Sequence, residues 1–102
     1  MTEIENKLLT NMKSSIDLIS NSNINFIEFG LFGSAANGSY KCGSDIDIVL
    51  IVSELPNKRD IADLRCKLDY VDCDLAVMLK SSFDNPTTPF HKNVIQSYRR
   101  LR

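Results

Sequence analysis

Residues 30–52, which read GLFGSAANGSYKCGSDIDIVLIV, predict the fold and a candidate site together. An apolar strand leads into the Gly33-Ser34 turn, ten residues follow, and a second strand opens with Asp45-Ile46-Asp47. Side chains alternate along a strand, so Asp45 and Asp47 share a face, roughly 6.6 Å apart along the backbone. Two carboxylates on one face repel each other unless a cation lies between them. Mg²⁺ held together with substrate phosphates is the usual cation.

The Gly33-Ser34 turn supplies the groups that hold a phosphate. Backbone N–H groups in a tight turn and the Ser34 hydroxyl both donate hydrogen bonds to phosphate oxygens. A phosphate-binding turn beside a metal-binding pair of carboxylates is the arrangement that nucleotidyl transfer requires.

A third carboxylate is expected from the strand at residues 71–79, which reads VDCDLAVML. Asp72 and Asp74 share a face of this strand, and a buried carboxylate costs several kcal/mol unless it is paired or bound to metal. Asp74 directly precedes an apolar run, as Asp47 does, so we predict that Asp74 joins the pair. Asp72 is the alternative, and a third interpretation has both side chains facing solvent on a half-exposed strand.

The other segments predict one domain of alternating helices and strands. The expected helices cover residues 3–19, 56–68 and 90–101, the expected strands cover 24–32, 45–52 and 71–79, and residues 34–43 and 81–89 are expected to be irregular. We therefore predict a single domain over residues 1–102 of the α/β (α+β) class. Its core covers about residues 23–80, and a basic tail or helix covers 89–102.

Composition and charge limit the possible locations and partners. The chain has 102 residues, of which 43% are hydrophobic and 25% charged, and a formal net charge of −1. With no apolar run long enough for a bilayer and no signal segment, a cytoplasmic protein without membrane contact is expected. The last segment, residues 89–102, contains His91, Lys92, Arg99, Arg100 and Arg102 but no acidic residue. It is predicted either to contact RNA or an acidic partner, or to offset the dipole of a final helix.

The assembled residues resemble the minimal nucleotidyltransferases of the DNA polymerase β-like superfamily. That pattern has an apolar strand, Gly-Ser, ten residues, Asp-x-Asp opening the next strand and a third Asp on a later strand. The matching residues here are Gly33, Ser34, Asp45, Asp47 and Asp74, and the resemblance covers about residues 23–79. It implies a polymerase β-like palm fold, with a small mixed β-sheet backed by helices.

The resemblance also implies an activity, which is Mg²⁺-dependent transfer of AMP from ATP to a hydroxyl acceptor. Asp45 and Asp47 would hold two Mg²⁺ ions, and Asp74 would complete the second metal site. The nucleotide would be bound by Gly33, Ser34, Lys41 and Ser44. Many members are antitoxins that attach AMP to a tyrosine of a HEPN-domain ribonuclease. A HEPN toxin is therefore an expected partner, in a homo- or hetero-oligomer.

One departure from the family pattern supports an alternative function. Asn37 stands where the family commonly has arginine, and Lys41 is the nearest residue that could replace the missing charge. The alternative is a catalytically weak or inactive domain that acts as a binding antitoxin or partner-binding module. Retention of all the carboxylates favours catalysis, because an idle acidic cluster is electrostatically costly. Phosphatases that use Asp-x-Asp are excluded, since there the apolar strand precedes the pair, whereas here it follows.

Overall fold

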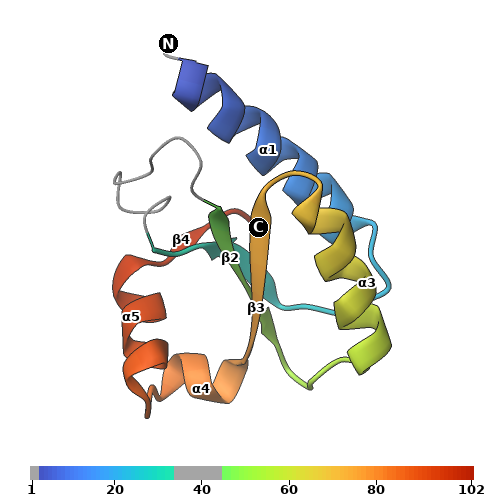
Figure 1. Ribbon diagram of the computed structural model, residues 1–102. Helices are drawn as coiled ribbons and strands as arrows, with labels where there is room; N and C mark the ends of the chain where they lie inside the picture. Colours follow the sequence, from blue (N-terminus) through green and yellow to red (C-terminus); the bar gives the residue numbers. More distant parts are fainter. Residues whose placement is uncertain (1–2, 34–44) are drawn as a thin grey trace.

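The computed structural model describes residues 3–33 and 45–102, which form a four-stranded mixed sheet with helices on both faces (Figure 1). The elements, in chain order, are α1 (Glu3–Ser20), β1 (Glu28–Leu31), β2 (Ile46–Val52), α3 (Lys58–Asp69), β3 (Cys73–Leu79), α4 (Lys80–Asp84), α5 (Pro89–Ser97) and β4 (Arg99–Arg100). The strand order is β3-β2-β1-β4. β2 runs parallel to β3 and antiparallel to β1, and β4 is antiparallel to β1. The predicted α+β class with a mixed sheet is confirmed.

The central strand β2 divides the core into two layers. Its apolar run is completely buried, as expected for a strand covered on both faces. The side chains that alternate along β2 pack into two clusters: Ile46, Ile48, Leu50 and Val52 on one face, and Val49 and Ile51 on the other. The first cluster includes α1 and α3 residues, and the second includes Val94 of α5. The sheet is therefore sandwiched between two pairs of helices (Figure 1).

The first two predicted helices are confirmed with small changes at their ends. In α1, Met12, Ile16 and Ile19 follow helical spacing and pack on the first cluster. Helix α3 begins at Lys58 instead of residue 56, because the Asn57 side chain caps it by accepting a hydrogen bond from the Arg59 N–H at 2.7 Å. Within the described ranges, no helix combines the length and apolar character needed to cross a membrane.

Three predicted boundaries are wrong, each because a tertiary contact or backbone geometry outweighs the local pattern. The strand predicted at 24–32 is reduced to β1, since Phe26 instead packs its ring edge-on against Phe29 in the core. The segment predicted to be irregular at 81–89 begins with the short helix α4, which carries a Lys80–Asp84 ion pair at 3.1 Å. The third strand starts at Cys73, because Asp72 adopts a left-handed conformation with φ 55°.

The C-terminal segment differs most from the sequence prediction. The helix expected at 90–101 ends at Ser97, the chain becomes extended at Tyr98, and Arg99–Arg100 form β4 on the edge of β1. The Leu101 N–H continues this pairing by donating to the Phe29 carbonyl at 2.8 Å. An unpaired edge of β1 favours a partner strand more strongly than the helical pattern favours helix. Arg99 and Arg100 are therefore not at a helix end, and the interpretation that they offset a helix dipole is wrong.

The largely buried carboxylate of Glu28 holds this C-terminal segment on the sheet. The Tyr98 hydroxyl donates to Glu28 Oε2 at 2.9 Å, and Arg100 Nε lies 3.4 Å from the same oxygen. The Glu28 side chain is only 13% exposed, so these two partners offset the cost of burying its charge. Burial and the hydrogen bond to Glu28 raise the pKa of the Tyr98 phenol, which keeps it protonated as the donor.

Substituting Gly30 tests how closely β4 lies against β1. A Cβ added at Gly30 would lie 2.8 Å from the Arg100 Cα and would also overlap the Arg99 carbonyl oxygen. Because both obstacles are backbone atoms, we expect Gly30→Ala to lower the free energy of unfolding by about 1–3 kcal/mol in urea denaturation. Arg99→Ala keeps the backbone ladder and is the control, with an expected loss below about 1 kcal/mol because the Arg99 side chain is exposed. Equal effects of the two substitutions would contradict the described β1–β4 pairing.

Candidate active site

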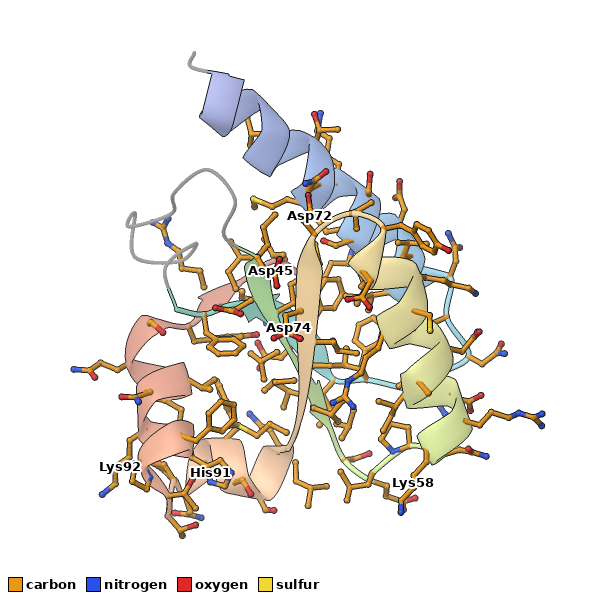
Figure 2. The ribbon with its side chains drawn as sticks, viewed as in Figure 1. Asp45, Lys58, Asp72, Asp74, His91 and Lys92 are labelled. Carbon is orange, nitrogen blue, oxygen red and sulfur yellow. The ribbon has the colours of Figure 1, made fainter. Side chains whose placement is uncertain are left out.

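The pairing of β2 with β3 brings two of the predicted carboxylates together. Asp47 and Asp74 are direct partners in the parallel register, and Asp45 lies two residues before Asp47 on the same face. This is the face covered by α4 and α5, because Val49 and Met78, which share it, belong to the second core cluster. Figure 2 shows Asp45 and Asp74 at the same end of the two strands.

The structure distinguishes Asp72 from Asp74. Asp74 lies opposite Asp47, and its charge acts on the Asp47 carboxylate. Asp72 lies before β3, where its carbonyl accepts a hydrogen bond from the Ile46 N–H at 2.8 Å. The charge of Asp72 acts on Cys73 and not on Asp47. Burial raises the pKa of the Cys73 thiol to about 11, against a hydrogen bond with Ser15 that lowers it, and the charges of Asp72 and Asp45 add to the rise. Asp74 is thus the nearer neighbour of Asp47.

Burial and neighbouring negative charges both act on the Asp47 carboxylate. Its partial burial, followed by the charges of Asp74 and Asp45, raises its pKa above the usual 3.8. Within residues 3–33 and 45–102, no group of three His, Cys, Asp or Glu side chains is arranged to hold a metal ion. Mg²⁺, however, usually binds one or two carboxylates and completes its shell with substrate phosphates and water. The oxygen donors of Asp47 and Asp74, with Asp45 beside them, fit that mode of binding.

Gly33 lies directly against the Asp47 carboxylate. Its φ of +70° favours glycine, and a Cβ built there would be 2.8 Å from Asp47 Oδ2. The preceding Phe32 N–H donates to the Asp47 backbone carbonyl at 3.1 Å, which fixes the end of β1 beside β2. Conformation and space therefore both require glycine at this position.

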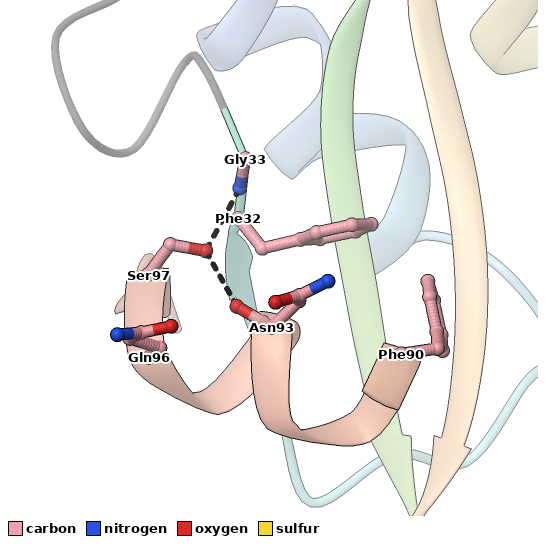
Figure 3. A pocket seen from close by; sticks show the side chains of 6 residues that line it. All are labelled: Phe32, Gly33, Phe90, Asn93, Gln96 and Ser97. Carbon is pink, nitrogen blue, oxygen red and sulfur yellow. Dashed lines mark hydrogen bonds between the residues drawn. The ribbon is translucent and has the colours of Figure 1, made fainter. Parts of the chain in front are cut away.

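A residue that the sequence did not single out holds the same turn. The Gly33 N–H donates to Ser97 Oγ at 3.0 Å, and that hydroxyl donates to the Asn93 carbonyl at 3.0 Å (Figure 3). The Gly33 N–H is thus bonded within the protein and is not the open donor to phosphate that the sequence suggested. No local pattern could identify Ser97, because it is separated from Gly33 by 64 residues. The other predicted nucleotide-binding residues, Ser34, Lys41 and Ser44, lie outside the described residues, as does Asn37.

Solved structures of similar fold come from nucleotidyltransferases and toxin–antitoxin complexes. A candidate nucleotidyltransferase from Sulfolobus solfataricus is 22% identical, with 97% of this chain and 83% of that chain covered and a TM-score of 0.68. A toxin–antitoxin structure with AMP-PNP is 22% identical, with coverages of 90% and 73% and a TM-score of 0.68. The tri-AMPylated Shewanella oneidensis HEPN toxin in complex with MNT antitoxin gives 20% identity, coverages of 93% and 71%, and a TM-score of 0.63. At these sequence identities, the structural similarity shows that this chain shares the fold of these proteins.

Sequence comparison gives the family. A search among curated proteins gave no significant match. The family model described as "Polymerase beta, Nucleotidyltransferase" matches residues 13–101, which include both strands that carry the aspartates and the C-terminal segment. The chain therefore belongs to the polymerase β nucleotidyltransferase family.

Proposed function

We propose that this chain is a Mg²⁺-dependent adenylyltransferase that transfers AMP from ATP to a hydroxyl group of a partner protein. The observation that carries the proposal is the register of β2 and β3, which sets Asp47 opposite Asp74 on one face. The pKa of Asp47, which burial and then the charges of Asp74 and Asp45 raise, supports it further, because a bound cation would offset both causes. The family shown by residues 13–101 has this type of chemistry.

Each residue has a distinct role in the proposed reaction. Asp45 and Asp47 would hold the metal ions, and Asp74 would add a further carboxylate ligand. When bound, Mg²⁺ neutralises phosphate charge and lowers the pKa of the acceptor hydroxyl. Gly33 keeps the turn close to the Asp47 carboxylate, and Ser34, Lys41 and Ser44 bind the triphosphate. Together these residues align the acceptor oxygen, the α-phosphorus and the pyrophosphate leaving group.

The proposed donor and partner follow from the similar structures. One of them contains AMP-PNP, and another is a complex of an AMPylated HEPN toxin with an MNT antitoxin. We therefore propose ATP as the donor and a HEPN-domain protein as the acceptor. The exposed Arg99 and Arg100 of β4 offer positive charge to such a partner or to its RNA.

Removing one carboxylate of the pair tests catalysis. We expect Asp47→Asn and Asp74→Asn each to reduce AMP transfer by at least about 100-fold, because each removes charge that holds the metal. The measurement is transfer of label from [α-³²P]ATP to a HEPN partner in millimolar Mg²⁺. Asp63→Asn is the control, since Asp63 is exposed on α3 and paired only with Lys67, at 3.4 Å, among the ion pairs of the described residues. Full activity in both test variants would refute the catalytic proposal.

Transfer and inhibition measured together separate the proposal from the binding-antitoxin alternative. If the chain inhibits the HEPN partner by AMP transfer, inhibition requires ATP and is lost in Asp47→Asn. If it inhibits by occlusion, one equivalent suffices without ATP, and Asp47→Asn inhibits as well as the wild type. The second result would establish the binding function instead.

The raised pKa of Asp47 predicts a pH-dependent gain in stability for Asp47→Asn. The folded state binds the Asp47 proton more tightly than the unfolded state. The stability that this proton contributes to the wild type is therefore present below pH 3.8 and is lost as the pH rises through the folded pKa. Without metal, Asp47→Asn should therefore unfold at a higher temperature than the wild type at pH 7, with no gain below pH 3.8. Millimolar Mg²⁺ should raise the melting temperature of the wild type but not of the variant. Identical wild-type and Asp47→Asn curves at pH 7 would contradict the raised pKa of Asp47.

A further inference from the structure

A cavity of about 530 Å³ lies beside the candidate active site, and the proposed reaction assigns it no role. The cavity is lined by Phe32, Gly33, Phe90, Asn93, Gln96 and Ser97 (Figure 3). Pockets that bind small molecules have volumes of roughly 300–1,000 Å³ and are mostly apolar with a few polar groups. This cavity has both properties.

The cavity opens on the same side of the sheet as the carboxylates. Phe32, which lines the cavity, packs against the second core cluster with Val49 and Ile51. Asp47 lies on the same face of β2 as these two residues, because it precedes Val49 by two positions. Gly33 lies between the cavity and the carboxylates. It lines the cavity, and Asp47 Oδ2 occupies the space that a Cβ on Gly33 would need. A ligand in the cavity is therefore adjacent to groups bound at Asp47.

The lining favours an uncharged, planar ligand. The described residues that line the cavity include no ionisable side chain, so they suit an uncharged group better than a phosphate. The Phe90 ring is half-exposed and stands perpendicular to the Phe32 ring, with 6.0 Å between their centroids. A partly exposed aromatic ring of this kind can stack with a nucleobase.

Two amides add polar recognition at the cavity. Asn93 and Gln96 are exposed, lie three residues apart on α5 and thus project from neighbouring positions on the helix. Each amide has a donor and an acceptor, which is the pair that matches the edge of adenine.

We propose that this cavity binds the base of the donor nucleotide, with Phe90 stacking on the ring and Asn93 and Gln96 hydrogen-bonding to its edge. The proposal rests on the proposed function, because the base reaches the cavity when the triphosphate is held at the carboxylates. It gives α5 a role in nucleotide binding and gives the enzyme a basis for base selection outside the Gly-Ser and Asp-x-Asp segments.

Two probes separate base binding from phosphate binding. Dissociation constants for Mg-ATP and for Mg-tripolyphosphate, which has no base, are measured by calorimetry on the wild type, Phe90→Leu and the double variant Asn93→Ala/Gln96→Ala. We expect both variants to bind Mg-ATP about tenfold more weakly, and Mg-tripolyphosphate within about twofold of the wild type. Alanine is the best helix former, so the double variant should keep α5. Lys92→Ala is the control, because Lys92 lies on α5 and projects away from the sheet (Figure 2).

The outcomes distinguish this proposal from the proposed function. If the wild type binds neither probe, both are wrong. If the wild type binds both probes but the variants bind Mg-ATP as tightly as the wild type, the cavity is not the base site, while nucleotide binding at the carboxylates stands. Weaker binding of both probes in the variants would indicate a general disturbance of the Gly33 turn and would also refute the base site.

Discussion

Parallel hydrogen bonding between β2 and β3 is the interaction on which both the core and the candidate site depend. The register pairs Asp47 with Asp74 and, by alternation, sends Ile48 and Leu75 into the core on the other face. A slip of one residue would exchange the two faces of a strand. It would place an aspartate in the cluster packed on α1 and α3, where a charge has no partner. The cost of burying that charge therefore specifies the register that also assembles the carboxylates.

The same register also places like charges next to each other. The apolar run of β2 is completely buried, and the free energy gained by this burial offsets the repulsion. Burial of these side chains is the largest favourable term available to a strand, at about 25 cal/mol per Å² of apolar surface. The repulsion around Asp47 opposes it at one end of the sheet, where Asp45 and Asp74 remain exposed to water. Local instability of this kind is common at functional sites, where it is offset by the rest of the structure and relieved by the ligand.

The sequence predicted those parts of the structure that depend on local pattern. The apolar run after Asp47 identified β2, and helical spacing identified α1 and α3. The C-terminal strand could not be predicted, because its determinants are the edge of β1 and the Glu28 carboxylate, which bonds a tyrosine 70 residues away. The contact of Ser97 with Gly33 escaped prediction for the same reason. The carboxylate pair could be predicted only because Asp47 and Asp74 each stand directly before an apolar run in the sequence.

These long-range contacts make the C-terminal segment part of the candidate site. Tyr98 and Arg100 fix the chain to Glu28 on β1, and one residue before Tyr98 the Ser97 hydroxyl accepts the Gly33 N–H. The anchor and the turn contact are adjacent in sequence, so the position of the chain at Tyr98 constrains the Ser97 hydroxyl that holds the turn beside Asp47. Helix α5 carries Ser97 and most of the cavity lining on one rigid element. Glu28 thus anchors the segment that follows the turn contact and the cavity lining, although it lies at the opposite end of β1 from the carboxylates.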